Sequence, residues 1–339
     1  MADTAQTLAI IFAALAQTFP DKVITQLNRT ATTLGLLRVV PGSGKNVPWD
    51  VEGDDGAVAE NHAEGADAAN FGSDTPEPAT LSWGQYRANF HVTDLAEAAA
   101  AANSGGPADL RSPWARNWMN AIRKLASLLN GAMHTGAGTG TTIAGLQGAM
   151  LKDDNTYAGI DRTVKTWFQA KVIDPGALTT LTRDQIGLDL ADIKTASGER
   201  PDLGLCSPKV FQKLRGLFDS SRVYSKEIYT ARGKTLLDNS ADVVVIDNCQ
   251  FVEDKDHTES QISYINTNYV EIEVLPRADG WASPLIPAEL SDISTLLSAF
   301  HAYEIARLGE SRRASVAAKM QLKCLRPNSC GIRKNVSIA

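Results

Sequence analysis

The sequence contains few of the residues that build covalent or metal-bound frameworks. Only four cysteines occur in 339 residues, at positions 206, 249, 324 and 330, and no two of them form a Cys-x-x-Cys pair. The five histidines are scattered, so no His/Cys cluster has the spacing of a zinc site. These absences argue against a disulfide-stapled or zinc-bound fold and favour a reducing compartment.

Long apolar runs are also missing. The longest one near the start, residues 8–16, is too short to span a bilayer, and the absence of a preceding basic residue argues against a signal peptide. Its apolar positions are instead spaced for one face of a helix, which we expect to pack on protein. These positions are Leu8, Ile11, Phe12, Leu15 and Phe19.

Positive charge is in slight deficit. The chain has 33 Lys and Arg against 39 Asp and Glu, a net charge of −6, which makes it a poor general binder of nucleic acid. Nine of the acids lie between Asn46 and Tyr86, where no Lys or Arg occurs. Such a segment buries little surface by itself, so we expect it to project from a body whose core the 43% of apolar residues can fill.

Hydrophobic periodicity predicts a mixture of helices and strands. Residues 81–92 alternate as a strand with two different faces, and residues 47–51 can pair with it in a long hairpin with an acidic tip. Residues 110–136 predict the longest helix, with Ser112 as N-cap, Pro113 at its first position and Gly136 as its end. Its apolar stripe consists of Trp114, Trp118, Ile122, Leu125, Leu129 and Met133.

The second half of the chain continues this mixture. Helices are predicted over 181–196 and 208–217, and strands over 201–207, 241–247 and 270–274. Residues 314–324 form a long closing strand with an apolar face and a face that is wet or interfacial. The apolar face carries Val316, Ala318, Met320 and Leu322, and the other face carries Ser315, Lys319, Gln321 and Lys323.

Two glycine-rich stretches could suggest phosphate binding, but neither has the required pattern. HTGAGTGTTIAG, residues 134–145, follows a helix where a dinucleotide-binding loop must follow a strand, and its third glycine is misplaced. We interpret it as a hinge at the end of the long helix. PGSGKN, residues 41–46, lacks the first glycine and the Ser or Thr of a P-loop, so a tight turn is the better interpretation.

Several segments, in this order, resemble the major capsid proteins of tailed bacteriophages, which have the Hong Kong 97-like fold. The resemblance covers roughly residues 20–335. It rests on QLNRTATTLGLLRVVPGSGKNVPWDV (26–51), TLSWGQYRANFHVTDL (80–95), LRSPWARNWMNAIRKLASLLNG (110–131), YAGIDRTVKTWFQAKV (157–172), PDLGLCSPKVFQKLRGL (201–217) and RRASVAAKMQLKCLRP (312–327).

The resemblance implies an α+β capsid fold with named parts. These are an N-terminal arm (1–42), an extended loop (43–95), a peripheral domain with a long spine helix (96–175 and 291–339) and an axial domain (176–290). It also implies a non-enzymatic shell protein that forms hexamers and pentamers around double-stranded DNA, without cofactor, metal, catalytic residue or sequence-specific DNA contact.

Partners and location follow from the same resemblance. We expect a portal and separate scaffolding or decoration proteins, no membrane, assembly in the bacterial host cytoplasm and a final place in the virion capsid. Relatives often begin with a long charged scaffolding segment. Residues 1–25 are short and mostly apolar, so we expect any scaffold here to be a separate protein.

Because the extended loop of the family crosses a neighbouring subunit, opposite charges predict the contact between subunits. We expect Glu60, Glu64 and Asp67 of one copy to lie against basic residues of the closing strand in the next. Those basic residues are Arg313, Lys319 and Lys323.

Two other functions remain open at this point. An encapsulin-type nanocompartment has the same fold and would need an inner groove for cargo peptides. A nucleotide-dependent enzyme would use the loop from Gly136 to Gly145, and a nucleotide-binding titration would test it.

Overall fold

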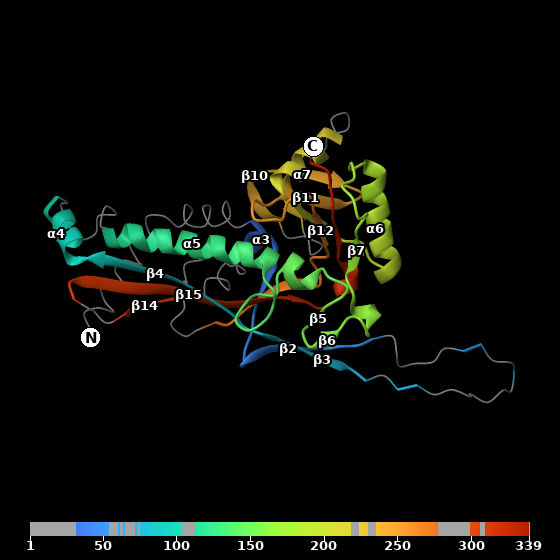
Figure 1. Ribbon diagram of the computed structural model, residues 1–339, viewed down its shortest axis with the longest axis horizontal. Helices are drawn as coiled ribbons and strands as arrows, with labels where there is room; N and C mark the ends of the chain where they lie inside the picture. Colours follow the sequence, from blue (N-terminus) through green and yellow to red (C-terminus); the bar gives the residue numbers. More distant parts are fainter. Residues whose placement is uncertain are drawn as a thin grey trace.

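The structure is a computed structural model. It describes residues 32–53, 60–61, 64, 72–73, 75–103, 113–217, 224–229, 235–276, 299–305 and 309–338. The helix expected over residues 8–19 and the cap expected at Ser112 lie outside these residues. Figure 1 shows a long helix, α5, lying along an elongated sheet, with a second sheet and two further helices at one end. Within the described residues no helix is long and apolar enough to cross a membrane.

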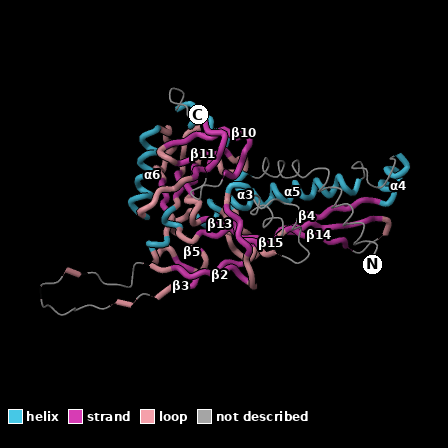
Figure 2. Tube along the Cα trace, turned by 180° about the vertical axis from the view of Figure 1, so that it is seen from behind, coloured by secondary structure: helices cyan, strands magenta, loops and turns pink. Residues whose placement is uncertain are grey.

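The elongated sheet has five strands. Its order is β1 (Arg38–Pro41), β13 (Val270–Val274), β15 (Ser311–Cys324) and β14 (Phe300–Ile305), and β4 (Gly84–Thr93) pairs with β15. β15 is the predicted closing strand, and it lies between β4 and β14 with antiparallel register on both sides. Figure 2 shows β4, β14 and β15 running together below α5. The predicted closing strand, β15, is therefore the central strand of this sheet, because it pairs with β13, β14 and β4.

Helix α5 (Pro113–Thr135), called the spine helix below, covers one face of the five-stranded sheet. Its predicted apolar stripe is buried: Trp114, Trp118, Ile122, Leu125 and Leu129 are at most 8% exposed. Phe90 of β4 packs between the two tryptophans, with ring centroids 4.9 Å from Trp114 and 5.6 Å from Trp118. Helical spacing thus places a row of large side chains over the even-numbered residues of β4 and β15.

The second sheet has seven strands. Its order is β7 (Lys171–Ile173), β16 (Gly331–Arg333), β12 (Ile262–Ile265), β8 (Leu203–Cys206), β11 (Cys249–Glu253), β10 (Thr235–Ile246) and β9 (Tyr224–Tyr229). All four residues of β8 are buried, as expected for a strand covered on both faces. Leu203 and Leu205 face the same core as the spine helix, which joins the two sheets into one packed unit.

Helices α6 (Arg183–Ser197) and α7 (Pro208–Leu217) cover the other face of the seven-stranded sheet. Thr182 caps α6 in a reciprocal capping box with Gln185, and Gly198 ends it in the left-handed conformation. Buried Asp189 of α6 accepts from the Tyr264 hydroxyl at 2.8 Å and from Arg333 at 2.6 Å. The helices predicted over 181–196 and 208–217 are therefore confirmed to within two residues.

The predicted hairpin is wrong in its pairing. β2 (Asn46–Val51) pairs antiparallel with β3 (Glu77–Ser82), from Asn46–Ser82 to Val51–Glu77. Most of the alternating segment predicted over residues 81–92 lies in β4, and β4 pairs instead with β15 over ten residues, from Gly84–Met320 to Thr93–Ser311. The buried Trp83 separates the two strands, and its indole donates to the Gly44 carbonyl at 3.1 Å. Residues 77–93 therefore serve two different sheets.

Sheet membership also cuts across the predicted division of the chain. β13 lies in the range expected for the axial domain, yet it pairs with β15. β7 and β16 lie in the ranges expected for the peripheral domain, yet they form one side of the seven-stranded sheet. The closing part of the chain thus contributes β15 to one sheet and β16 to the other, with η4 (Pro327–Ser329) between them.

A buried arginine fixes the segment between the two sheets. After the π-helical turn η1 (Leu146–Met150), the short strands β5 (Thr156–Tyr157) and β6 (Ile160–Asp161) form a turn in which Ala158 and Gly159 have positive φ. Arg162 then donates to the carbonyls of Met150 and Lys152 at 2.8 and 2.6 Å, and its guanidinium lies 4.5 Å from the Tyr157 ring centre. Burial lowers the pKa of Arg162.

Three distant segments meet at a buried polar cluster around Asp254, which follows β11. The cluster joins α3 (Thr32–Leu36) to the spine helix and the seven-stranded sheet. From the spine helix, Asn130 Nδ2 lies 3.0 Å from Asp254 Oδ1, and His134 Nε2 lies 3.2 Å from Oδ2. All of these side chains are buried, so this contact fixes the angle between the helix and the sheet.

Candidate assembly surface

The sequence contains no recognisable set of catalytic residues. The candidate functional site is therefore a surface through which copies of the chain contact each other. The face of β4 and β15 that points away from the spine helix carries their odd-numbered residues. Directly paired residues share a face, so the register places Arg87 beside Ala317, Lys319 beside Gln85 and Arg313 beside His91. Arg87 and Arg313 are exposed, and Lys319 is half-buried.

This surface, called the basic face below, contains no acid among its described residues. Its β4 side runs from Gln85 to Thr93 and its β15 side from Ser311 to Lys319, counting odd positions only. β14 extends it with Tyr303 and Ile305, which are 40% and 41% exposed. A net-acidic chain therefore has a local face where positive charge and exposed apolar area occur together.

Lys323, which the sequence predicted to contact a second copy, is not exposed on the basic face. It is 8% exposed, and its ammonium lies 2.9 Å from Glu271 and 2.7 Å from Glu273 of β13. Burial alone would lower the pKa of Lys323, but the hydrogen bonds that its ammonium donates to both carboxylates outweigh this effect and raise that pKa. Lys323 is thus part of the folded core, and its charge is not available to a second copy.

The face of β15 that was predicted to be wet or interfacial is also buried at Gln321. This side chain is fully buried, accepts from the Ala144 N–H at 2.7 Å and donates to the Ser82 carbonyl at 2.5 Å. Gln321 and Lys323 therefore fasten the end of β15 to its neighbours. Ser315 is buried as well, at 1% exposed. Among the odd-numbered residues of β15, only Ser311, Arg313, Ala317 and Lys319 are at least partly exposed.

The acids of the predicted contact are only partly described. Glu60 and Glu64 are exposed, and Asp67 lies outside the described residues. Glu77, at the start of β3, is paired with Lys165 of the same chain at 2.6 Å. The sequence did not indicate that Arg87 belongs to the basic face, because the strand that contains Arg87 was predicted to pair with residues 47–51 rather than with β15.

The glycine-rich stretch forms a closed turn that is fastened to itself, which differs from the predicted hinge. The Gly136 N–H donates to the Ala132 carbonyl and so adds one more helical hydrogen bond at the end of the spine helix. The Gly138 N–H donates to the Ile143 carbonyl, and the Gly145 N–H donates to the Gly136 carbonyl. A side chain at Gly136, Gly145 or Gly148 would overlap neighbouring backbone atoms. The amides that would hold a phosphate are therefore used within the turn, which argues against a nucleotide site.

Comparisons with known proteins agree with this geometry. Residues 21–337 match the model of the family described as SU10 major capsid protein. No curated protein matches the chain. The capsid asymmetric unit of cyanophage A-1(L) has a similar structure, with a TM-score of 0.69 and 18% identity, covering 90% of this chain and 93% of that chain.

Two further solved structures share the fold. The holo-SrpI encapsulin complex from Synechococcus elongatus has a TM-score of 0.56 and 11% identity, covering 91% of this chain and 88% of that chain. A structure from Mycobacterium phage Bobi has a TM-score of 0.53 and 11% identity, covering 90% of this chain and 89% of that chain. At these identities the likeness shows the fold alone.

The match to a capsid protein family over most of the chain, together with the mixed α+β fold, defines a shell-forming structural protein. The chain belongs to the SU10 major capsid protein family. It is a phage major capsid protein that forms the icosahedral shell of the virion, and it is not an enzyme. The resemblance found in the sequence is confirmed, and the nucleotide-dependent alternative is wrong.

Proposed function

We propose that copies of this chain assemble as hexamers and pentamers, with different roles for the two sheets. The seven-stranded sheet with α6 and α7 serves as the axial domain, around the axis of each ring. The five-stranded sheet with the spine helix serves as the peripheral domain. The β2–β3 hairpin, within residues 43–82, supplies the extended loop, β4 belongs to the five-stranded sheet, and residues 1–42 supply the arm. The support for this division is that each sheet has its own helical cover.

The extended loop of one copy lies on the basic face of the next. The observation that carries this proposal is the charge of the two partners: Arg87, Arg313 and Lys319 on a face without described acids, against an acid-rich loop that includes Glu60 and Glu64. Arg87 replaces Lys323 in the predicted set. Each exposed pair contributes only about 0.2–1 kcal/mol, but the shell repeats the contact in every subunit.

A charge-reversal experiment tests the contact. Arg87→Glu with Arg313→Glu should impair assembly, most strongly at low salt, where screening is weakest. Glu60→Lys with Glu64→Lys in the same chain should partly restore it. Lys124→Glu with Lys194→Glu, two exposed positions on the spine helix and α6, makes the same change in net charge elsewhere. Sedimentation and negative-stain microscopy report the yield of shells. Equal yields from both double reversals would refute the loop contact.

The shell encloses double-stranded DNA without sequence-specific contacts, and works with a portal and with separate scaffolding or decoration proteins. The net charge of −6 supports loose containment of the genome rather than tight binding. Subunits should bind free DNA weakly, with an affinity that falls steeply as salt rises. Filter binding measures this, and nanomolar affinity at physiological salt would contradict the proposal.

A further inference from the structure

Two of the cysteines lie together where the chain passes from one sheet to the other. Cys324 is the last residue of β15 in the five-stranded sheet, and Cys330 directly precedes β16 in the seven-stranded sheet. Both are free thiols and fully buried, and the Cys324 thiol donates a hydrogen bond to the Cys330 sulfur. The segment from Cys324 to Gly331 is called the joint below.

A tight turn brings the two cysteines to the same place. The Tyr269 N–H donates to the Asn266 carbonyl at 3.1 Å, which closes a turn between β12 and β13. Cys324 pairs with Val270, directly after this turn. The Cys330 sulfur accepts from the Asn266 N–H, at the start of the turn, at 3.5 Å. Because the two ends of such a turn lie within about 7 Å of each other, the backbone itself places the two cysteines side by side.

The buried guanidinium of Arg162 supplies positive charge to this pair of thiols. Its Nε and Nη2 atoms are buried without a hydrogen-bond partner in the described part of the chain, and its charge interacts with both sulfurs. Tyr157 connects the groups, because its ring centre lies 4.5 Å from the guanidinium and its hydroxyl accepts from the Cys324 N–H at 3.0 Å. A nearby cation favours a thiolate over a thiol.

The two thiols differ in how easily they ionise. The hydrogen bond from Cys324, together with one from the Asn266 N–H, lowers the pKa of Cys330, although burial alone would raise it. Burial raises the pKa of Cys324. Cys330 is therefore the thiol that ionises first and attacks an oxidant, and Cys324 is the thiol that completes a bond to it.

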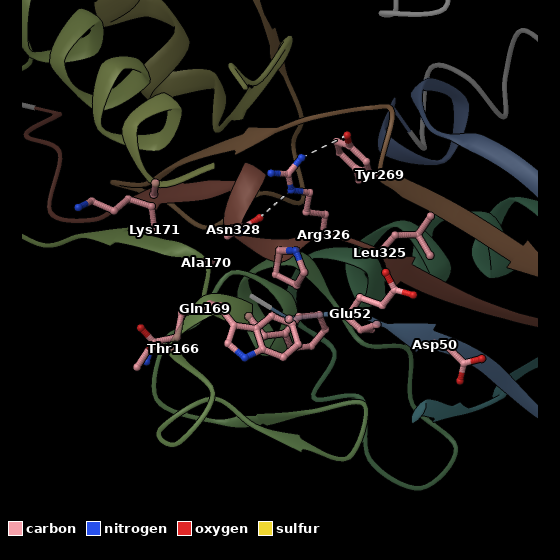
Figure 3. A pocket seen from close by; sticks show the side chains of 16 residues that line it. Asp50, Glu52, Thr166, Gln169, Ala170, Lys171, Tyr269, Leu325, Arg326 and Asn328 are labelled. Carbon is pink, nitrogen blue, oxygen red and sulfur yellow. Dashed lines mark hydrogen bonds between the residues drawn. The ribbon is translucent and has the colours of Figure 1, made fainter. Parts of the chain in front are cut away.

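The joint forms part of the wall of a groove of about 840 Å³. The residues that line it from the joint are Leu325, Arg326, Pro327 and Asn328. Figure 3 shows the side chains of Leu325, Arg326 and Asn328 at this groove. Local opening of this short segment therefore exposes the two thiols to small solutes that enter the groove.

We propose that Cys324 and Cys330 form a reversible disulfide within one chain, with a low-molecular-weight disulfide as the oxidant. The Cys330 thiolate attacks one sulfur of the oxidant, which forms a mixed disulfide and releases the first thiol. Cys324 then loses its proton and attacks the Cys330 sulfur, which releases the second thiol. The protein thus loses two electrons and two protons, and the oxidant gains them as it becomes two thiols.

The disulfide holds the end of β15 against the start of β16 and so fixes the joint between the two sheets. A reducing cytoplasm keeps the pair as thiols while the chain folds and assembles, and oxidising conditions outside the cell favour the disulfide in the finished virion. The bond lies within one chain, so this inference does not depend on the proposed contacts between copies.

Equilibration of the folded, full-length protein with mixtures of reduced and oxidised glutathione tests the proposal. After acid quenching and alkylation in denaturant, only two of the four cysteines of the oxidised protein should react. Peptide mass spectrometry should find Cys324 linked to Cys330. Cys206 and Cys249 are the internal control, because both are buried on neighbouring strands, but Cys206 pairs with Glu253 and not with Cys249. Both should be alkylated throughout.

A second measurement tests whether the bond fixes the joint. Oxidation should raise the midpoint of thermal unfolding of the wild type, and dithiothreitol should reverse the rise. Cys330→Ala should abolish this response, whereas Cys249→Ala, which removes another fully buried thiol, should preserve it. Four reactive cysteines after oxidation, links between chains, equal oxidation of the control pair, or an unchanged wild-type midpoint would each overturn the proposal.

Discussion

The Thr33 hydroxyl donates a hydrogen bond to Asp254 at 2.7 Å across 221 positions of the sequence, with both side chains buried. The Thr33 N–H donates to the same oxygen at 3.1 Å, and the Asp256 N–H donates to the other oxygen at 2.9 Å. Burial alone would raise the pKa of Asp254, but the hydrogen bond and the charge interaction with His134, together with hydrogen bonds from Asp256 and Thr33, outweigh this effect and hold that pKa well below its usual value. The groups around Asp254 thus stabilise its ionised form inside the folded protein.

The first prediction concerns this carboxylate. Asp254→Asn should lower the free energy of unfolding by roughly 3 kcal/mol, because several buried donors lose their acceptor. The segment from Thr32 to Leu36 should also become the earliest site of limited proteolysis. Thermal unfolding and mass spectrometry of the first fragments provide the readouts. Glu253→Gln, at the exposed neighbouring position, is the control and should change neither.

The second prediction concerns the spine helix. Trp118→Ala removes a side chain that is 2% exposed and packs against Phe90 and Trp114. The resulting cavity should cost roughly 3–5 kcal/mol and lead to insoluble protein or failed assembly. Lys124→Ala on the exposed side of the same helix should assemble normally. Normal particle yields from Trp118→Ala would show that this contact is not needed.

The third prediction separates folding from assembly on β15. Lys323→Ala leaves Glu271 and Glu273 buried without their shared cation, so it should destabilise the isolated subunit by roughly 3–5 kcal/mol. Lys319→Ala, half-buried on the basic face, should leave subunit stability within about 0.5 kcal/mol of the wild type. Denaturant unfolding of unassembled subunits gives both values. Equal stability of the two variants would contradict the core role of Lys323.

The fourth prediction concerns pH. Burial lowers the pKa of His257 to about 3. Its Nδ1 donates to the Thr258 carbonyl at 2.9 Å, and its Nε2 accepts from the Gln147 amide at 2.9 Å. The orientation of that amide is set by Thr258, whose hydroxyl donates to the Gln147 oxygen. The folded protein therefore holds the neutral imidazole.

Since the unfolded pKa is about 6.5, the unfolded state binds a proton first as the pH falls. His257 thus contributes stability that is complete above about pH 6.5 and is lost as the pH falls toward 3. Each pH unit inside this window should remove up to about 1.4 kcal/mol. His257→Asn should have a shallower dependence than the wild type in chemical unfolding between pH 6.5 and 4. Parallel curves would contradict the prediction.

The sequence by itself determined the elements whose signals are local. Periodicity placed α7 at residues 208–217 and β13 at 270–274, and it identified the buried stripe of the spine helix. Capping and turn residues such as Thr182 and Gly198 act within a few positions of the chain. The order of these segments was enough to recognise the family, because a capsid fold keeps its elements in sequence even where identity is low.

Only the tertiary structure decided the partners. Alternation shows that residues 84–93 form a strand but carries no information on which strand pairs with them, and β15, more than 200 residues away, proved to be that partner. The same limit applies to single charges. Lys319 and Lys323 share one face of β15, yet the pairing of β13 buries Lys323 between two glutamates, whereas Lys319 stays half-exposed. Burial and pairing depend on which segments meet in space, and those contacts are set by the packing of both sheets together.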